Sequence, residues 1–148
     1  MTTKLDVTKD RDKYIGGSDI PVIMGLSPFR SRWDLLQEKA LGKASDFEGN
    51  EYTKYGTEME PVIRDYINDN GAHFVDDEVR IDGDLRYHAD GWEKKSNQHC
   101  HSRLLEIKTT SKAPQFDGGR ICDQKEFILG SYKAYVVQLL LGMKLFIS

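Results

Sequence analysis

The chain has few of the residues that define several large protein classes. Its 148 residues include two cysteines, Cys100 and Cys122. Two cysteines cannot by themselves form a disulfide scaffold, a four-thiolate zinc site or an iron–sulfur cluster. No apolar run approaches the roughly 20 residues that a membrane-spanning helix requires, and no secretory signal pattern opens the sequence. These absences predict an intracellular protein in a reducing compartment.

The excess of one charge sign is also small. A formal net charge of −3 argues against a polycation that coats nucleic acid without specificity, because such binding depends on neutralising phosphates. It leaves open a nucleic-acid enzyme, since carboxylates that bind a metal ion make the total negative while local basic patches hold the substrate. With 39% hydrophobic and 30% charged residues, the composition is typical of a soluble globular protein.

The chain shows no internal repeat, low-complexity tract or Gly/Pro/Ser-rich linker, so residues 1–148 are predicted to form one domain. An order of helices, then strands, then a helix predicts a mixed α/β fold with one central mixed β-sheet flanked by helices. The predicted segments are an N-terminal arm (1–13), a helical part (14–71), a β-hairpin core (73–109), a helix (124–142) and the start of a strand (143–148).

Capping residues and apolar spacing define the helices of the helical part. Ser31 is predicted to cap a helix over residues 32–41, which Gly42 ends. Residues 43–54 are polar and predicted to be a loop. Apolar residues spaced i, i+3, i+4, i+7 and i+8 predict an amphipathic helix over residues 59–69.

The most informative residues lie in the predicted hairpin core. Residues two apart in a strand face the same side, so Glu106 and Lys108 project together. If residues 87–94 and 102–109 form a hairpin, its register pairs Asp90 with Glu106, and their Cβ atoms lie roughly 5 Å apart. Two carboxylates at that spacing repel each other unless a cation lies between them.

This pair of carboxylates predicts a metal-dependent hydrolytic centre. Oxygen ligands with room for water molecules suit Mg²⁺, which takes one or two carboxylates. Lys108 beside that ion could orient or deprotonate a water, as hydrolysis of a phosphodiester requires. The alternative is that Asp90 and Lys108 are solvated strand residues that form a surface ion pair.

Glu60 is a third candidate carboxylate, at the start of the predicted helix over residues 59–69. Two interpretations stay open at this point. Glu60 could contribute to the metal centre, or Thr57-x-x-Glu60 could be a capping box in which the Glu60 carboxylate accepts a hydrogen bond from a backbone N–H.

A zinc site is a weaker alternative. The run His99-Cys100-His101 is rich in zinc-ligating side chains, and His88 and Cys122 could join it. The run lacks the C-x₂-C or H-x₃-H spacing of zinc motifs. An exposed polar hairpin tip is the favoured interpretation.

Five short motifs follow one another in the order found in a known family. They are Arg11…Ile15-Gly16-Gly17-Ser18-Asp19-Ile20, Gly56-x-x-x-Glu60-Pro61, Ala89-Asp90-Gly91, Glu106-Ile107-Lys108 and Tyr135-x-x-Gln138. Together they make the chain, from Arg11 to about Met143, resemble the YqaJ-like viral recombinase family of phage lambda-type exonucleases, within the PD-(D/E)-x-K nuclease superfamily. The resemblance implies a restriction-endonuclease-like core, here without the family's usual C-terminal elements.

The resemblance implies catalytic roles for five residues. Asp90, Glu106 and the carbonyl of Ile107 would bind Mg²⁺, for which Mn²⁺ would substitute. Glu60 would reach the metal site directly or through water, and Lys108 would contact the attacking water.

It also implies roles for three residues outside the hairpin core. Gln138 corresponds to the family's glutamine that closes the active site. Arg11 and Ser18 lie where related enzymes hold the 5′-phosphate of a DNA end, and a hydroxyl, free N–H groups at a helix N-terminus and an arginine suit an anion. Ordinary N-capping by Ser18 is the alternative.

The function that the resemblance implies is a Mg²⁺-dependent deoxyribonuclease acting 5′-to-3′ on double-stranded DNA ends. Its product, a 3′ single-stranded overhang, would pass to a phage single-strand annealing protein in the cytoplasm of a bacterial host. The family also implies a homo-oligomer, and no membrane partner is expected. The alternatives are an endonuclease or resolvase of the same fold and a non-catalytic module that binds DNA ends.

Overall fold

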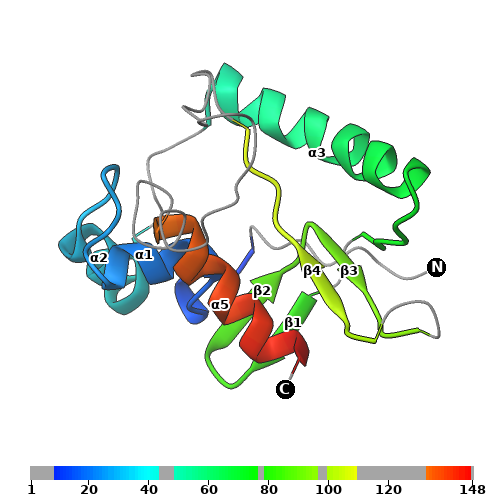
Figure 1. The fold of residues 1–148 in the computed structure, drawn as a ribbon. Helices are drawn as coiled ribbons and strands as arrows, with labels where there is room; N and C mark the ends of the chain where they lie inside the picture. The colour runs from blue at the N-terminus through cyan, green and yellow to red at the C-terminus, as the bar shows by residue number, and fades with distance from the viewer. Residues whose placement is uncertain (1–8, 44–48, 77–78, 97–99, 110–132, 148) are drawn as a thin grey trace.

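The structure is a computed structural model that describes residues 9–43, 49–76, 79–96, 100–109 and 133–147 (Figure 1). The helices are the short 3₁₀ turns η1 (Arg11–Lys13) and η2 (Gly17–Asp19), followed by α1 (Ile20–Ile23), α2 (Arg32–Leu41), α3 (Glu51–Asp69) and α5 (Lys133–Ile147). The strands are β1 (Val79–Asp82), β2 (Leu85–His88), β3 (Gly91–Glu93) and β4 (Arg103–Leu105). The predicted mixed α/β class is confirmed.

The four strands form two antiparallel hairpins rather than the one central mixed sheet that the sequence predicted for this part of the chain. In the first hairpin β1 pairs with β2 across a turn at Gly83, whose φ is +57°. In the second β3 pairs with β4. A single parallel bridge, Ile15 to Leu85, and an antiparallel bridge, Val75 to Trp92, join further segments to the hairpins.

The predicted strand over residues 87–94 is interrupted at Ala89 and Asp90, which separate β2 from β3. The polar groups of Asp90 explain the interruption. Its carboxylate Oδ2 accepts the N–H of Ile107 at 2.6 Å, and its backbone carbonyl accepts a hydrogen bond from Arg64 Nη1 at 2.5 Å. Since both groups bond outside a strand ladder, the regular pairing begins at Gly91.

Helix α3 begins earlier than the sequence predicted, inside the segment expected to be a loop. Asn50 caps it, because its side-chain oxygen accepts the N–H of Thr53 at 3.0 Å. Thr57 therefore lies within the helix, where its hydroxyl donates to the carbonyl of Thr53 at 3.0 Å. The capping-box interpretation of Glu60 is wrong for this reason.

The prediction that residues 143–148 begin a strand is also wrong, because α5 continues to Ile147. Phe146, only 8% exposed, belongs to the core with Tyr87, Ala89, Trp92 and Leu141. Its ring centroid lies 6.2 Å from that of Tyr87, edge to face, and 5.0 Å from that of Trp92. A helix places Leu141 and Phe146 against these rings.

Helix α5 crosses in front of the β1–β2 hairpin (Figure 1) and links the N-terminal helices to the strands through its contacts. It packs against α1 and η2 at one end and against β1, β2 and β4. The close approach depends on Gly142, where a Cβ would lie 2.6 Å from atoms of Tyr87 and Leu104. None of the helices formed by the described residues has the length and apolar character needed to cross a bilayer.

Candidate active site

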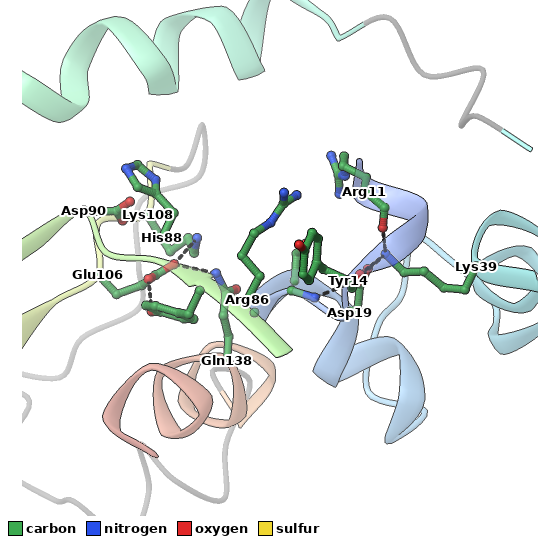
Figure 2. Close-up of a pocket in the computed structure, with 14 residues that line it drawn as sticks. Arg11, Tyr14, Asp19, Lys39, Arg86, His88, Asp90, Glu106, Lys108 and Gln138 are labelled. Carbon is green, nitrogen blue, oxygen red and sulfur yellow. Dashed lines mark hydrogen bonds and ion pairs between the residues drawn. The ribbon is translucent and has the colours of Figure 1, made fainter. Parts of the chain in front are cut away.

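A cleft of about 240 Å³ lies among the N-terminal turns, β2, the residues after β4 and α5 (Figure 2). The residues predicted for the site, except Glu60 and Ile107, line this cleft. They are Arg11, Ser18, Asp90, Glu106, Lys108 and Gln138. The fold thus brings together residues that are far apart in sequence, namely the N-terminal pair, Asp90 before β3, the two residues after β4, and Gln138 of α5.

The second hairpin sets the positions of Asp90 and Glu106. Its pairs are Gly91 with Leu105, Trp92 with Leu104 and Glu93 with Arg103. This is the register that the sequence predicted. It places Asp90 and Glu106 just beyond the pair formed by Gly91 and Leu105. Ile107 donates its N–H to Asp90, so the two strand ends are also fastened to each other at the site.

Three side chains contact the carboxylate of Glu106. Gln138 Nε2 donates to Oε1 at 2.6 Å, Lys108 Nζ lies 2.5 Å from the same oxygen, and the hydroxyl of Tyr87 donates to Oε2. Lys108 therefore pairs with Glu106, and Asp90 is 8% exposed. The interpretation of Asp90 and Lys108 as a solvated surface pair is wrong.

Asp90 is buried beside a second carboxylate, that of Glu106. Burial, and next the neighbouring carboxylate of Glu106, raise the pKa of Asp90 from 3.8 to about 7. The N–H of Ile107 and the ammonium of Lys108 lower it, but by less. Burial and Glu106 also raise the pKa of the Tyr87 phenol, which keeps that group a hydrogen-bond donor.

Glu60 lies near this group but does not line the cleft. Its Oε1 is 3.6 Å from Nη1 of Arg64, one turn further along α3. The guanidinium of Arg64, in a residue only 5% exposed, also donates to the carbonyl of Asp90 and pairs with Asp76 at 2.7 Å. Glu60 is close enough for its charge to contribute to the raised pKa of Asp90.

The carboxylates of Asp90 and Glu106 are candidate ligands for Mg²⁺ rather than for a metal ion that needs three or four side-chain ligands. Within the described ranges, no three His, Cys, Asp or Glu side chains converge on a point that could hold a metal ion. Asp90 and Glu106 are the two carboxylates here that could hold a metal ion, and Mg²⁺ takes one or two carboxylates and keeps several waters.

The zinc alternative has no support among the described residues. His88 lines the cleft, whereas Cys100 and His101 are exposed. These three do not converge as metal ligands. The other two candidates, His99 and Cys122, lie outside the described residues.

Arg11 and Ser18 lie on the other side of the cleft, on the two N-terminal turns. Ser18 is exposed, and its side chain caps neither η2 nor α1, so the capping alternative is wrong. The N–H of Gly16 is taken instead by the carboxylate of Asp19, at 2.8 Å. Ser18 and Arg11 both line the cleft.

Sequence reasoning missed four residues that hold the site together, namely Lys39, Arg64, Arg86 and Tyr87. Arg86 stacks its guanidinium 4.8 Å from the ring centroid of Tyr14 and donates to the carbonyl of Lys9 at 2.9 Å. Of these four residues, Tyr87 could have been found from the sequence, because it adjoins His88-Ala89-Asp90 in a predicted strand. The other three residues are basic, and each donates a hydrogen bond to a backbone carbonyl that is distant in sequence.

Two comparisons with known proteins bear on this site. A family model described as the YqaJ-like viral recombinase domain matches residues 7–145. The match covers the N-terminal turns, Asp90, the residues after β4 and Gln138. Among curated proteins, none matches the chain.

Proposed function

The chain belongs to the YqaJ-like viral recombinase domain family, and from this premise we propose that it is a Mg²⁺-dependent deoxyribonuclease acting on double-stranded DNA ends. The family indicates a phage-type recombination nuclease. The observation that supports the finer proposal is that Arg11 and Ser18, the pair expected to bind phosphate, line one cleft with Asp90, Glu106 and Lys108. A cleft of this kind suits an enzyme that grips a terminal phosphate while it hydrolyses a nearby phosphodiester.

Each residue of the cleft has a chemical task in this proposal. Asp90, Glu106 and the Ile107 carbonyl would hold Mg²⁺, which when bound neutralises charge on the phosphate and lowers the pKa of a coordinated water. Lys108, whose ammonium lies beside Glu106, donates a hydrogen bond to the attacking water and orients it. Gln138 holds the Glu106 carboxylate in place, since it donates to Oε1.

Arg11 and Ser18 bind the 5′-phosphate of the DNA end. An arginine can donate two parallel hydrogen bonds to phosphate oxygens, and the serine hydroxyl adds a third donor. Binding at the 5′ end makes the enzyme a 5′-to-3′ exonuclease. Its 3′ overhang is the substrate of a phage single-strand annealing protein in the host cytoplasm.

Three further features belong to the proposal. The two hairpins and α5 are part of a restriction-endonuclease-like core, the active form is a homo-oligomer, and Mn²⁺ replaces Mg²⁺. The family match supports the first two. The all-oxygen donor set supports the third, because Mn²⁺ accepts the same ligands.

The test is digestion of a 5′-phosphorylated linear duplex with Mg²⁺, beside a covalently closed circle of the same sequence. We expect degradation of the linear DNA from its 5′ ends and no cleavage of the circle. Lys108→Ala should lose at least about 100-fold in rate, yet still bind DNA ends with Ca²⁺. Lys54→Ala, which removes an exposed α3 lysine, is the matched control and should cleave like wild type.

Each contrary result would favour a different function. Cleavage of the closed circle would favour an endonuclease or resolvase, which Arg11→Ala would leave active. End binding without any cleavage by the wild-type chain would favour a non-catalytic module. Full activity of Lys108→Ala would contradict the proposed active site.

A further inference from the structure

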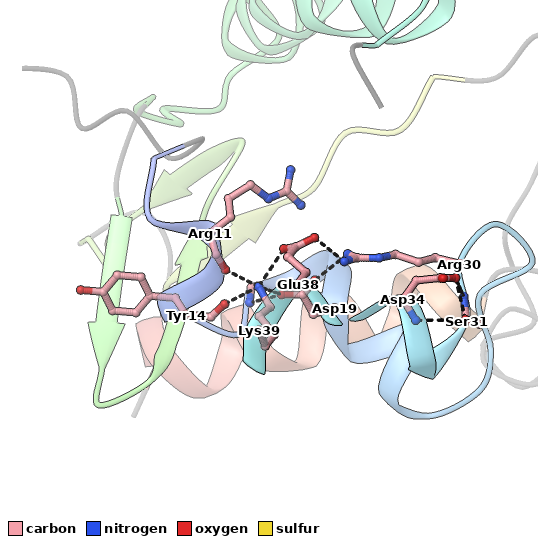
Figure 3. A network of polar contacts seen from close by, with 9 residues as sticks. Arg11, Tyr14, Asp19, Arg30, Ser31, Asp34, Glu38 and Lys39 are labelled. Atoms are coloured by element: carbon pink, nitrogen blue, oxygen red, sulfur yellow. Dashed lines mark hydrogen bonds and ion pairs between the residues drawn. The ribbon is translucent and has the colours of Figure 1, made fainter. Parts of the chain in front are cut away.

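The ammonium of Lys39 is bound to the two N-terminal turns rather than exposed on α2 (Figure 3). Its Nζ donates to the backbone carbonyl of Arg11 and to that of Tyr14, the latter at 2.6 Å. It also forms an ion pair with Oδ2 of Asp19 at 2.9 Å. The side chain is 17% exposed, so these contacts are made largely away from water.

The number of donors on Lys39 matches this set of acceptors. An ammonium has three N–H groups, and the carbonyls of Arg11 and Tyr14 and the carboxylate of Asp19 take all three. A fourth acceptor, Glu38 Oε1, lies 3.3 Å from the same nitrogen, is buried, and has no hydrogen-bond partner among the described residues. All three donors of the ammonium are therefore used by acceptors in the segment between residues 11 and 19.

That segment carries both residues proposed to bind the 5′-phosphate. Arg11 is held through its own carbonyl, and Ser18 is followed directly by Asp19, which is 2% exposed. Asp19 is itself fixed, because it accepts the N–H of Gly16 and lies 3.5 Å from Arg30 Nη1. One nitrogen thus holds this segment at two main-chain carbonyls and one side-chain carboxylate, and these contacts determine how far apart Arg11 and Ser18 lie.

Lys39 leaves the guanidinium of Arg11 available for a ligand. Its contact is with the backbone of Arg11, and Figures 2 and 3 show the guanidinium directed away from the ammonium. A cation this close to an anion site could bind the anion itself, but all three of its donors are already used. Its effect on a bound phosphate must pass through Arg11 and Ser18.

We propose that Lys39 is a positioning residue that holds Arg11 and Ser18 at the spacing required by a terminal 5′-phosphate, and so makes the chain selective for phosphorylated DNA ends. This inference rests on the proposed function and deepens it. It predicts that the geometry of the ammonium matters as well as its charge. Arginine keeps the charge, but its planar donors cannot converge on three oxygens around one nitrogen.

The test compares binding of a duplex with 5′-phosphate ends and the same duplex with 5′-hydroxyl ends, in Ca²⁺ so that no cleavage is needed. The variants are Lys39→Met, Lys39→Arg and Asp19→Asn, with folding checked by circular dichroism. Asp19→Asn keeps the shape of the side chain and removes the charge that pairs with Lys39 at 2.9 Å and, more distantly, with Arg30 at 3.5 Å. Lys54→Met, at an exposed lysine, is the matched control.

We expect wild type and Lys54→Met to prefer phosphorylated ends. Each folded Lys39 or Asp19 variant should lose about tenfold or more of that preference, with affinity for hydroxyl ends unchanged, because a misplaced pair no longer fits the phosphate. In combination with Arg11→Ala, Lys39→Arg should cause a smaller loss than it causes alone, since the two substitutions share the Arg11 contact with the phosphate.

Two results would overturn the inference. One is a folded Lys39→Arg or Asp19→Asn variant that keeps the wild-type preference. The other is an equal loss of affinity for both duplexes, which would give Lys39 a structural role only. A wild-type chain that prefers phosphorylated ends but never cleaves DNA would refute the proposed nuclease and leave this inference standing.

Discussion

Asp90→Asn should make the metal-free protein more stable above neutral pH while it abolishes the proposed activity. A pKa of about 7 in place of the ordinary 3.8 means that ionising Asp90 costs about 4 kcal/mol more in the fold than in the unfolded chain, at about 1.4 kcal/mol per pKa unit. Asparagine has no charge to lose and still accepts the N–H of Ile107. At pH 8 the variant should therefore gain up to about 4 kcal/mol over wild type.

The sign follows from proton binding. Because the pKa of Asp90 is raised in the fold, the native chain binds a proton between about pH 4 and pH 7 that the unfolded chain has released. The contribution of Asp90 to the free energy of unfolding consequently falls as the pH rises through that window. The difference between variant and wild type should be near zero at pH 4 and largest at pH 8.

Urea denaturation with a chelator, from pH 4 to pH 8, measures this difference. Asp65→Asn, at an exposed carboxylate of α3, is the control and should give a flat difference. Added Mg²⁺ should raise the melting temperature of wild type and leave that of Asp90→Asn unchanged, since only wild type keeps both carboxylates. A difference independent of pH, or a variant less stable than wild type at pH 8, would refute the reasoning.

Three further substitutions test the surroundings of the site. Tyr87→Phe removes the hydroxyl that donates to Glu106, and should raise the Mg²⁺ concentration for half-maximal cleavage about tenfold; an unchanged titration would contradict this role. Arg64→Met leaves three oxygens without their partner, and should cost about 3–5 kcal/mol in urea denaturation; a loss below about 1 kcal/mol would be contrary evidence. Phe146→Ala should cost about 3–5 kcal/mol, whereas Met143→Ala on the exposed side of α5 should cost far less; equal losses would argue against the observed packing of α5.

Features set by neighbouring residues could be predicted from the sequence. Helix α2 has the predicted bounds, because Ser31 accepts the N–H of Asp34 at 3.1 Å and Gly42 adopts a φ of +63°. The register of β3 with β4 also follows the prediction, since it depends on alternation along two short strands. The same register brought Asp90 and Glu106 to one cleft.

Features set by distant contacts could not be predicted in this way. The apolar residues from Met143 to Ile147 fit a strand or a helix equally well, and packing of Phe146 on Tyr87 and Trp92 selects the helix. The break between β2 and β3 depends on an arginine of α3 that binds the carbonyl of Asp90. No local pattern contains that information.

The supporting basic residues illustrate the same limit. Lys39 and Arg64 are single charged positions in helices, with nothing in their spacing to separate them from solvated residues. Each has a backbone partner more than 20 positions away, the carbonyl of Tyr14 for Lys39 and that of Asp90 for Arg64. Only the fold shows that they hold the residues proposed to bind and cleave DNA.

Single-turnover release of the 5′-terminal nucleotide from an end-labelled linear duplex, by wild type and by Glu106→Gln, tests the central claim most directly. The account predicts Mg²⁺-dependent release by wild type and a loss of at least about 100-fold in the variant, which still accepts the hydrogen bond of Tyr87 and should remain folded. Absence of release by wild type with Mg²⁺, or release that neither the chelator nor Glu106→Gln reduces, would contradict it.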